Sequence, residues 1–390
     1  MSDPKHGPER RLRQQKEHVI RMKNYRILVI NPGSTSTKLS MFENEKCLFT
    51  ESAFHDSSIL RTFQTINDQL DYRMEVLHQF LEDSNIDLTG IDAIVGRGGG
   101  CYAVEGGIYN IDDRLIRHTR EGRGGLYHSS MLGVQMAKRL HDIYGGLMLM
   151  MDPPVVDELC DLARITGIDG IYRRAISHAL NLKATARTHA KRLGKKYTDC
   201  NFIVCHIDGG ISVTAHRKGR MIDGNDAGGG EGPFTPTRMG SMAVTDIIRY
   251  FQGSSSEEMR SLCSQAGGLS NYFGTSNSDV IHKMVEDGDK KATLVWNAMI
   301  YQIIKYIGAM STALQGQVDG IVLTGGLLRF PEVEEQIRES CGWIAPVTSY
   351  PGELEQEAMA AGALRVLRGE EEARTYPGKP VWSGFEDFGK

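Results

Sequence analysis

A turn near the N-terminus, within residues 26–42 (RILVINPGSTSTKLSMF), constrains the fold and the chemistry of this chain more than any other segment. Apolar residues typical of a buried strand lead into the turn, and the next strand is expected to begin at Lys38. The hydroxyl side chains of Ser34–Thr37 could donate hydrogen bonds to phosphate. A plain hairpin uses the same residue types, so this turn alone leaves both interpretations open. It is no Walker A loop, because Lys38 leads into a strand and not into a helix.

The composition is that of an ordinary globular protein, with 40% hydrophobic and 24% charged residues. A length of 390 residues allows two domains, each with its own core. The formal net charge of -4 gives no reason to expect nucleic acid or an anionic membrane as a partner. No apolar run approaches the roughly 20 residues of a membrane span, so we expect no membrane segment.

Cysteine usage indicates a reducing compartment. The seven cysteines form no C-x-x-C pair and their number is odd, so we expect a cytoplasmic protein whose thiols are free. The first 24 residues are polar and basic and lack the apolar region of a signal peptide. We therefore expect residues 1–24 to be a flexible extension, although Met22 could equally be the natural start.

Apolar strands alternate with helical periods, which predicts an α/β fold. The longest helical period, residues 293–314, places Val295, Met299 and Ile303 on one stripe, as a core-facing helix requires. Shorter helical patterns cover about 71–81, 129–143, 177–193 and 355–368. Strands are expected at Arg26–Ile30, Lys38–Phe42, Ala93–Val95, Gly107–Ile111, Leu147–Met151, Phe202–Cys205, Ser212–His216 and Gly320–Thr324.

A partial repeat suggests two similar halves. The strand, glycine turn and strand of residues 30–42 recur at residues 204–216 (VCHIDGGISVTAH). Each half would offer one glycine hairpin, and a cleft between the halves would place both hairpins around one polyphosphate. No repeat is closer than this one, which argues against solenoids and propellers.

Four further clusters carry residue types that phosphoryl transfer uses. Arg97 follows a strand and is flanked by glycines that would let a substrate approach the backbone. Asp152 ends another strand and is fixed by two prolines, while Arg238 lies between turn residues. A later strand stops at Gly325 and Gly326, where a nucleotide base and ribose could lie against bare backbone. Each cluster alone is typical of a turn or a surface charge. Together they indicate transfer of a phosphoryl group to or from a nucleotide.

This ordered set resembles the acetate and butyrate kinase family, which has the actin-like ATPase fold of sugar kinases and Hsp70. The resemblance covers residues 25–371. VINPGSTSTK at 29–38 resembles the first phosphate loop, HIDGGIS at 206–212 the second, and LTGG at 323–326 the adenosine segment. Other motifs are similar to butyrate kinases in particular: RGG at 97–99, DPPVVDE at 152–158, SHALN at 177–181, AHRKGR at 215–220, GPFTP at 232–236 and ALRVLRG at 363–369.

The resemblance implies a reversible reaction in which a short-chain carboxylate and ATP give an acyl phosphate and ADP, with Mg2+. A carboxylate is already nucleophilic at neutral pH, so the enzyme needs alignment and charge neutralisation more than a strong base. Arg97 and Arg238 would hold the carboxylate and neutralise the transferring group, and Asp152 and Glu355 would position the metal. The expected catalytic residues are Asn31, Arg97, Asp152, Arg174 and Arg238, and the expected nucleotide-binding residues are Gly33, Ser34, Ser36, Lys38, His206, Asp208, Gly209, Gly210, Gly325 and Gly326.

Several positions depart from the family pattern or have a structural alternative. Arg174 stands where acetate kinases carry a histidine, and it could donate to the phosphoryl group or form an ion pair elsewhere. Asp208 replaces a glycine of the second phosphate loop, so it is either a metal-shell residue or a brake on activity. His128 either belongs to the substrate pocket or opens a helix. His178 is expected to order the site and not to react.

The expected length of the acid is inferred from Gly99. Acetate kinases have a bulky apolar residue at the matching place, so a glycine would open volume beside Arg97. Each buried CH2 contributes roughly 0.8 kcal/mol, so a four-carbon acid would gain ~1.6 kcal/mol over acetate. Butyrate and isobutyrate are the expected acids, and Gly99, His128, Pro153 and His178 the expected pocket.

The expected architecture is a two-domain, actin-like (ribonuclease H-like) α/β fold with a duplicated mixed-sheet core and helices on both faces. The domains would span 25–152 and 153–354, with a final helix at 355–390 crossing back to the first. The family implies a homo-oligomer, at least a dimer. The alternatives are an acetate, propionate or branched-chain acid kinase, an ATPase of the actin or Hsp70 kind, and a non-catalytic relative that binds nucleotide.

Overall fold

The computed structural model describes residues 23–125 and 128–386. The chain separates into two compact units, which we call unit 1 and unit 2. Residues 1–22 of the expected N-terminal extension lie outside the described part. Unit 1 holds the chain up to Tyr102, Gly107–Pro153 and Gln356–Lys379, and unit 2 holds Ala103–Gly106, Pro154–Glu355 and the residues from Pro380 onward.

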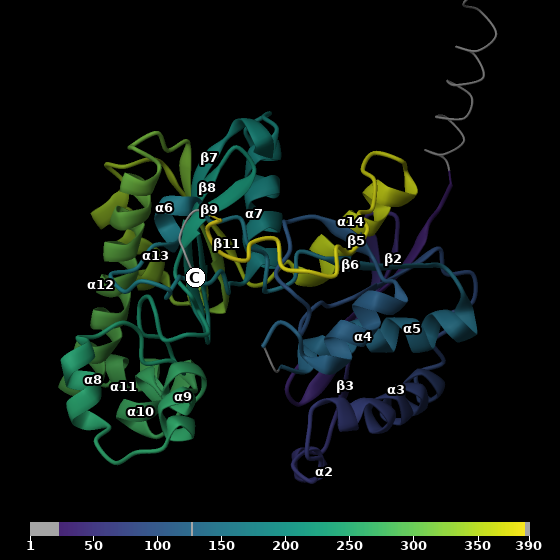
Figure 1. The fold of residues 1–390 in the computed structure, drawn as a ribbon, viewed down its shortest axis with the longest axis horizontal. Coiled ribbons are helices and arrows are strands. Elements are labelled where there is room, and N and C mark those ends of the chain that lie inside the picture. The colour runs from purple at the N-terminus through teal and green to yellow at the C-terminus, as the bar shows by residue number, and fades with distance from the viewer. Residues whose placement is uncertain (1–22, 126–127, 387–390) are drawn as a thin grey trace, which may run out of the picture. The chain divides into compact units, whose positions relative to one another are not determined.

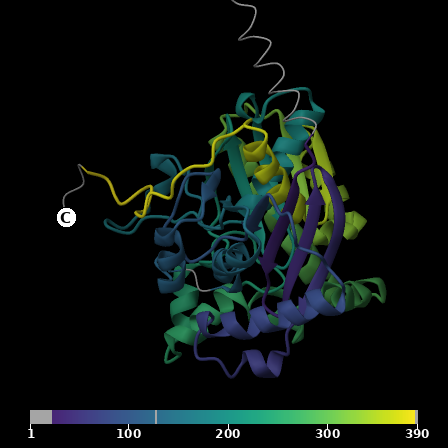
Figure 2. The ribbon, with the colours of Figure 1, turned by 90° about the vertical axis from the view of Figure 1, so that its right-hand side faces the viewer.

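Unit 1 is built on a mixed sheet with the strand order β3-β2-β1-β4-β6-β5. Hairpins join β1 to β2 and β2 to β3, β4 runs parallel to β1 and β6, and β5 pairs antiparallel with β6. Figure 2 shows β1, β2 and β3 side by side in purple. The strands are β1 (Arg26–Pro32), β2 (Ser36–Glu43), β3 (Lys46–Phe54), β4 (Ala93–Gly96), β5 (Ile108–Asn110) and β6 (Leu147–Met151).

Helices from both ends of the chain pack on this sheet. The helix α14 (Glu355–Leu367) reaches it through Gly362, where any Cβ would clash with Met151. Gln356 at the start of α14 donates to Oγ of Ser40 on β2 at 2.9 Å. The other helices of unit 1 are α2 (Ser57–Leu60), η1 (Asn67–Gln69), α3 (Leu70–Asp83), α4 (Asp113–Glu121), η2 (Ser129–Met131) and α5 (Leu132–Tyr144).

Unit 2 has a second mixed sheet with the strand order β11-β10-β7-β8-β9. Its β7 (Asn201–Ile207) and β8 (Ile211–Arg217) form the second glycine hairpin, and β10 (Gly320–Gly325) runs parallel to β7. In Figure 1, α7 (Ala179–Arg192) and α12 (Lys290–Ala313) lie on opposite sides of this sheet. The remaining elements are β9 (Arg220–Gly224), β11 (Val347–Pro351), α6 (Asp161–Arg164), η3 (Tyr197–Asp199), α8 (Val244–Tyr250), α9 (Ser256–Ser264), α10 (Gly268–Phe273), α11 (Ser278–Glu286), η4 (Gly326–Arg329) and α13 (Pro331–Cys341).

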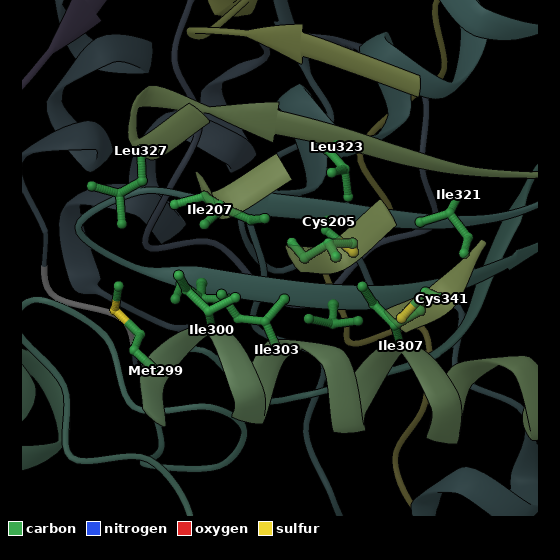
Figure 3. Close-up of a cluster of buried hydrophobic side chains, with 14 of the residues drawn as sticks. Cys205, Ile207, Met299, Ile300, Ile303, Ile307, Ile321, Leu323, Leu327 and Cys341 are labelled. Atoms are coloured by element: carbon green, nitrogen blue, oxygen red, sulfur yellow. The ribbon is translucent and has the colours of Figure 1, made fainter. Parts of the chain in front are cut away.

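Successive side chains along the central strands of unit 2 point to opposite faces of the sheet, and each face packs against its own helix layer. Ile203 and Cys205 of β7 belong to the core under α12, whereas Phe202 and Val204 belong to the core under α7. Figure 3 shows the α12 side, where Ile303 and its neighbours point at the strands. Both faces of the sheet are therefore buried, which explains the continuous apolar runs in the sequence.

The predicted strands and helices are confirmed at all of the expected places. The sequence reasoning missed β3, whose residues are mostly exposed and lack an apolar face, and the short strands β9 and β11. It also missed α4, α13 and the short helices of residues 244–286. The final helix is shorter than the expected 355–390, because it ends at Leu367 and Gly369 takes a left-handed conformation (φ 69°).

Within residues 23–125 and 128–386, every helix is too short or too polar to cross a bilayer.

A buried polar cluster lies behind the first turn in unit 1. The N–H of His55 donates to the carbonyl of Thr35 at 2.9 Å, and its Nε2 lies 2.8 Å from Oγ1 of Thr37. Burial, and then the positive charge of Arg73, lower the pKa of His55 to about 4. The imidazole is therefore neutral in the folded protein at neutral pH.

We predict that His55 makes the fold acid-sensitive. Its pKa is lower in the folded than in the unfolded chain, so between pH ~6.5 and ~4 only the unfolded chain binds this proton. The free energy of unfolding should fall as the pH falls through that window, with up to roughly 3 kcal/mol from His55. Denaturant unfolding of the wild type and His55→Gln across pH 4–7 measures the difference. Parallel pH profiles for the two proteins would contradict the assignment.

Candidate active site

The first glycine turn joins β1 to β2 in unit 1. Asn31 and Lys38 are paired across the hairpin, and the N–H of Gly33 donates to the carbonyl of Ser36 at 2.7 Å. Ser34 and Lys38 are exposed, and the other three are partly exposed. The structure thus brings together the residues predicted for the first phosphate loop, with hydroxyl groups and one ammonium group open to a ligand.

Arg97 directly follows β4, and its N–H donates to the carbonyl of Ile30 at 2.9 Å. The glycine after it serves close packing. A Cβ on Gly98 would lie 2.5 Å from Sδ of Met150 and 2.8 Å from Cβ of Pro153. Gly98 therefore lets the segment of Arg97 pack closely on the end of β6, and the access of a substrate to this backbone stays a prediction.

Gly99 also serves packing, so the expectation of open volume beside it is wrong. A Cβ at this position would lie 2.6 Å from Oγ of Ser130 and 3.1 Å from the backbone nitrogen of Met131. The segment of η2 thus occupies the space that a larger side chain would need. Gly99 therefore gives no argument about the length of the acid.

Asp152 follows β6 and is fully buried in a strained conformation. Its φ of 37° is uncommon for a residue other than glycine. Two hydrogen bonds to Gly107 hold it: Oδ1 accepts from the N–H at 2.7 Å, and its own N–H donates to the carbonyl at 3.1 Å. Such a strained and well-braced residue is typical of a functional site, and it fixes the direction of the carboxylate.

His128 begins η2 and caps it. Its Nδ1 accepts from the N–H of Ser130 at 3.2 Å, as the structural alternative requires. The side chain is exposed, so a second role in the substrate pocket stays a prediction.

The second glycine turn joins β7 to β8 in unit 2, and the segment 232–240 braces it. Oγ1 of Thr235 and Oγ1 of Thr237 both donate to the carbonyl of Gly209, at 2.7 and 3.0 Å. The N–H of Arg238 donates in turn to Oγ1 of Thr235 at 3.0 Å. The structure thus brings together two motifs that lie 26 residues apart in the sequence.

The guanidinium group of Arg238 lies against the backbone of Gly210. A Cβ on Gly210 would lie 2.5 Å from Cζ of Arg238, so only glycine lets the side chain take this place. Nη1 of Arg238 donates to the carbonyl of Ala227 at 2.6 Å. Burial lowers the pKa of Arg238, and the charge of Asp226 partly offsets this. Among the described residues its buried Nε has no hydrogen-bond partner.

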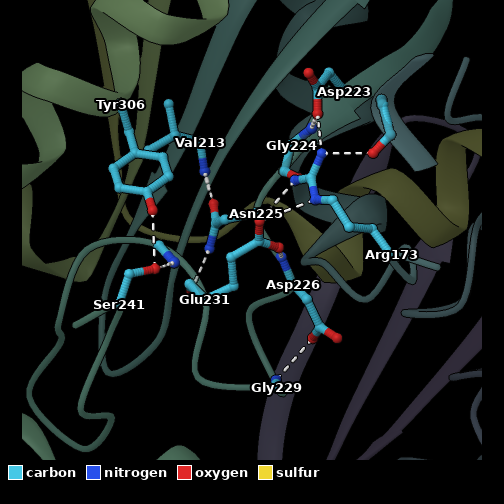
Figure 4. A network of polar contacts seen from close by, with 12 residues as sticks. Arg173, Val213, Asp223, Gly224, Asn225, Asp226, Gly229, Glu231, Ser241 and Tyr306 are labelled. Carbon is cyan, nitrogen blue, oxygen red and sulfur yellow. Dashed lines mark hydrogen bonds and ion pairs between the residues drawn. The ribbon is translucent and has the colours of Figure 1, made fainter. Parts of the chain in front are cut away.

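A polar network anchors the loop that carries Arg238 (Figure 4). Oδ1 of Asn225 accepts from the N–H of Val213 at 2.7 Å, which ties the loop to β8. Glu231 accepts from the N–H of Asp226 at 2.8 Å and from the guanidinium group of Arg173 at 2.9 Å. The position of Arg238 is therefore set by bonds that reach back into the sheet.

Arg174 lies next to this network but is exposed, unlike its neighbour Arg173. Burial raises the pKa of Asp226, and the nearby charge of Arg174 partly offsets that rise. This geometry leaves both alternatives for Arg174 open, a donor to the phosphoryl group or a partner of an acidic residue.

His178 and His206 stack in unit 2, with ring centroids 3.9 Å apart and planes at 17°. Nδ1 of His178 lies 2.8 Å from Oγ of Ser212, and Nδ1 of His206 lies 2.8 Å from Nδ2 of Asn181. These bonds fix the direction of both rings. The ordering role expected for His178 is consistent with this arrangement.

Asp208 links the second glycine turn to the Gly-Gly step at the end of β10. Its Oδ1 accepts from the N–H of Gly209 and its Oδ2 from the N–H of Gly326, both at 2.7 Å. Gly325 has a φ of 114°, and any Cβ there would clash with the backbone of Ile207. The two glycines are thus required by close packing on the turn, and the backbone expected to be bare is covered on that side. Two amide donors also reduce the repulsion that Asp208 would exert on phosphate.

One group of possible metal ligands exists among the described residues. His206, Asp208 and Glu353 place ligand atoms within 4.8 Å of one another. The expected metal residues were Asp152 and Glu355, the first residue of α14, and neither belongs to this group. Magnesium prefers oxygen ligands, so the two carboxylates fit it better than the imidazole does.

Two candidate residues were not predicted from the sequence. Arg73 is fully buried and contacts the first glycine turn. Its signal was a charged residue within the apolar stripe of α3, between Leu70 and Leu77. Glu353 had no comparable signal in the sequence. Only the left-handed conformation of Gly352 (φ 87°), the residue before it, distinguishes Glu353 from the other acidic residues nearby.

Comparison with known sequences finds clear relatives. A model described as the Acetokinase family matches residues 168–341. The chain is 43% identical over 355 residues to proteins named probable butyrate kinase from Clostridium botulinum strains Alaska E43 (type E3) and Eklund 17B (type B). These alignments cover 90% of this chain and 100% of each relative.

Comparison with solved structures confirms the predicted actin-like α/β fold. Acetate kinase from Porphyromonas gingivalis is similar with a TM-score of 0.70 at 18% identity, over 88% of this chain and 99% of that one. Acetate kinase from Entamoeba histolytica has a TM-score of 0.69 at 16% identity, over 86% and 98%. A propionate kinase from Francisella tularensis has 0.66 at 17% identity, over 87% and 98%.

We predict that Gly210→Ala moves the side chain of Arg238 but leaves the fold stable. The added methyl group would displace the end of a flexible side chain, so the free energy of unfolding should change by less than ~1 kcal/mol. Phosphoryl transfer from ATP should fall by at least roughly tenfold, because the guanidinium charge leaves its place. Turnover assays combined with denaturant unfolding measure both effects.

Gly308→Ala in α12 is the matched control for Gly210→Ala. A Cβ on Gly308 meets no atom of the described chain within 4 Å, so this variant should keep wild-type turnover and gain about 0.5–1 kcal/mol of stability. Wild-type turnover in a folded Gly210→Ala variant would show that the place of Arg238 is not needed.

Proposed function

The chain belongs to the acetokinase family, and on that premise we propose that it transfers a phosphoryl group reversibly between ATP and a short-chain carboxylate. The proposed reaction is butyrate + ATP = butyryl phosphate + ADP. The observation that carries the proposal is the 43% identity to relatives named probable butyrate kinase, which extends over their whole length.

The proposed chemistry is a direct in-line transfer. A carboxylate oxygen attacks the γ-phosphorus of ATP, one P–O bond forms, and the bond to the departing ADP oxygen breaks. The carboxylate is ionised at neutral pH, so no proton has to move and no strong base is needed. The obstacle is repulsion between the carboxylate and the phosphates, which positive charge and backbone N–H groups must overcome.

We assign the neutralising charges to Arg97 of unit 1 and Arg238 of unit 2. Arg238 supports this assignment best, because Gly210 and Ala227 hold its half-buried guanidinium group in place. A buried donor without an acceptor, such as its Nε, is costly, and an anionic ligand would satisfy it. Loss of such a charge is expected to slow the transfer by on the order of 10³-fold.

The two glycine turns would hold the phosphates of the nucleotide. In unit 1 the hydroxyl groups of Ser34 and Ser36 and the ammonium group of Lys38 would bind them, with Asn31 at the base of the hairpin. In unit 2 the backbone between Asp208 and Gly210 would do the same, and the step at Gly325–Gly326 beside it would take the adenosine.

We propose Mg2+ as the metal that accompanies ATP. It usually binds through one or two carboxylates, phosphate oxygens and water, and the carboxylates of Asp208 and Glu353 fit that donor set. Asp152 is the carboxylate of unit 1 that a braced backbone holds in one direction. When bound, Mg2+ would neutralise charge on the phosphates. A role for Glu355 stays a prediction.

The identity of the acid rests on the relatives, because packing around Gly99 removes the argument from open volume. We propose butyrate as the main substrate and isobutyrate as a related one. Acetate and propionate are the alternatives, since pockets discriminate weakly between acids that differ by one methylene group.

The place and assembly of the enzyme are part of the same proposal. All seven cysteines are free thiols, which fits the reducing cytoplasm. A homo-oligomer, at least a dimer, is proposed on the family alone.

We predict that the protein forms acyl phosphates that hydroxylamine traps as hydroxamates. With ATP and Mg2+, kcat/KM should be about tenfold higher for butyrate than for acetate, because two more methylene groups are buried. Assays over straight and branched acids of two to five carbons measure this preference.

Two results of the same assay would contradict the proposal. ATP hydrolysis without hydroxamate from any acid would indicate an ATPase of the actin or Hsp70 kind. Absence of both activities in a protein that binds ATP would indicate a non-catalytic relative. A preference for acetate would contradict only the choice of acid.

A further inference from the structure

Arg73 of α3 is buried directly behind the first glycine turn, with an exposed fraction of 0%. Its guanidinium group donates through Nη1 to the carbonyl of Gly33 and through Nη2 to the carbonyl of Ser34, both at 2.9 Å. Its Nε donates to Oε1 of Gln69, one helical turn earlier, at 3.1 Å. One planar group therefore holds two consecutive carbonyls of the turn, and Gln69 fixes its direction.

The acceptors around Arg73 are all neutral. Within residues 23–125 and 128–386, Arg73 forms no ion pair with a carboxylate. Burial lowers the pKa of Arg73 to about 10, so the group still carries its charge at neutral pH. A buried charge without a counter-ion destabilises a folded protein. Its retention behind a turn with exposed hydroxyl groups points to a counter-ion that arrives with a ligand.

The hydrogen bonds of Arg73 also determine where the amide groups of the turn point. In a trans peptide the C=O and N–H bonds point in opposite directions, and the described chain has no cis peptide bond. Because the carbonyls of Gly33 and Ser34 face Arg73, the N–H groups of Ser34 and Thr35 face away from it. Neither N–H donates to another described residue, and both residues are exposed. Two parallel N–H groups of this kind form an anion-binding nest, as at the start of a helix.

We propose that Arg73 is a positioning residue for phosphate. It orients the N–H groups of Ser34 and Thr35 toward the phosphates of the nucleotide, and its unpaired charge adds attraction from behind the turn. The inference rests on the proposed function for the identity of the ligand, ATP. Arg73 is thus a buried partner of the first turn that does not touch the substrate.

A purely structural role for Arg73 would have different consequences. If a residue only stabilises the fold, its replacement should lower the affinity for every ligand or for none, in parallel with the loss of stability. If a residue orients a phosphate nest, its replacement should lower the affinity of each ligand according to the number of phosphates that the ligand carries. Comparison of adenosine, ADP and ATP separates the two roles.

The test measures the binding of adenosine, ADP and ATP to the full chain by calorimetry. For Arg73→Met, which keeps length but removes charge and donors, the Kd of ATP should rise by roughly tenfold or more, since hydrogen bonds to charged groups are lost. The Kd of ADP should rise less, and the Kd of adenosine should not change. Arg73→Lys keeps the charge but cannot hold both carbonyls, so it should restore part of the affinity for ATP.

Arg217→Met is the matched control. Arg217 also donates from Nη2 to a backbone carbonyl, that of Ala313, at 2.7 Å, but it lies at the far end of β8 from the second turn. This variant should bind ATP as the wild type does.

The outcomes distinguish this inference from the proposed function. A folded Arg73→Met variant with wild-type affinity for ATP, or with equal losses for adenosine and ATP, would overturn the inference. If Arg73→Met does not fold, wild-type ATP affinity and kcat in Arg73→Lys would overturn it. A wild-type protein that binds ATP and makes no acyl phosphate would refute the proposed function, while a phosphate-graded loss in Arg73→Met would still support the nest.

Discussion

Hydrogen bonds from distant side chains fix carbonyl groups in both glycine turns. Arg73 holds two consecutive carbonyls that begin at Gly33 in unit 1. Thr235 and Thr237 hold the carbonyl of Gly209 in unit 2. A fixed carbonyl fixes the N–H group on the same peptide plane, so each turn would meet a phosphate without reorganising. Positioning and preorganised electrostatic stabilisation are the main contributions that a protein makes to phosphoryl transfer.

Positive charge in both units is kept at a cost in stability. Burial lowers the pKa of Arg73 and of Arg238, and among the described residues neither forms an ion pair with a carboxylate. Asp152 adds backbone strain at the end of β6. Each feature opposes folding, and each would be relieved or used when a polyphosphate and its metal bind. Conflicts between stability and local geometry of this kind are expected at functional sites.

Local pattern was enough to predict the strands that carry the turns, because apolar periodicity and glycine chemistry act over a few residues. It also indicated Arg238 and Asp152 as candidates. It failed where the cause lies in packing between distant segments. Gly99 was expected to leave open volume, but the segment of Ser130 fills that space. Glu355 was predicted to hold the metal, whereas Glu353 is the residue whose carboxylate lies within 4.8 Å of ligand atoms of His206 and Asp208. The sequence shows a small residue but not what lies against it.

We propose that Arg97 and Arg238 neutralise the same transferring phosphoryl group. A double-mutant cycle on kcat/KM for acyl phosphate formation, with Arg97→Met, Arg238→Met and the double variant, measures whether the two charges are coupled. We expect a loss on the order of 10³-fold in each single variant, and a smaller loss in the double variant than the product of the two. The interaction energy should be roughly 0.5–3 kcal/mol. Wild-type kcat/KM in either single variant would show that the charge removed there does not act on the phosphoryl group.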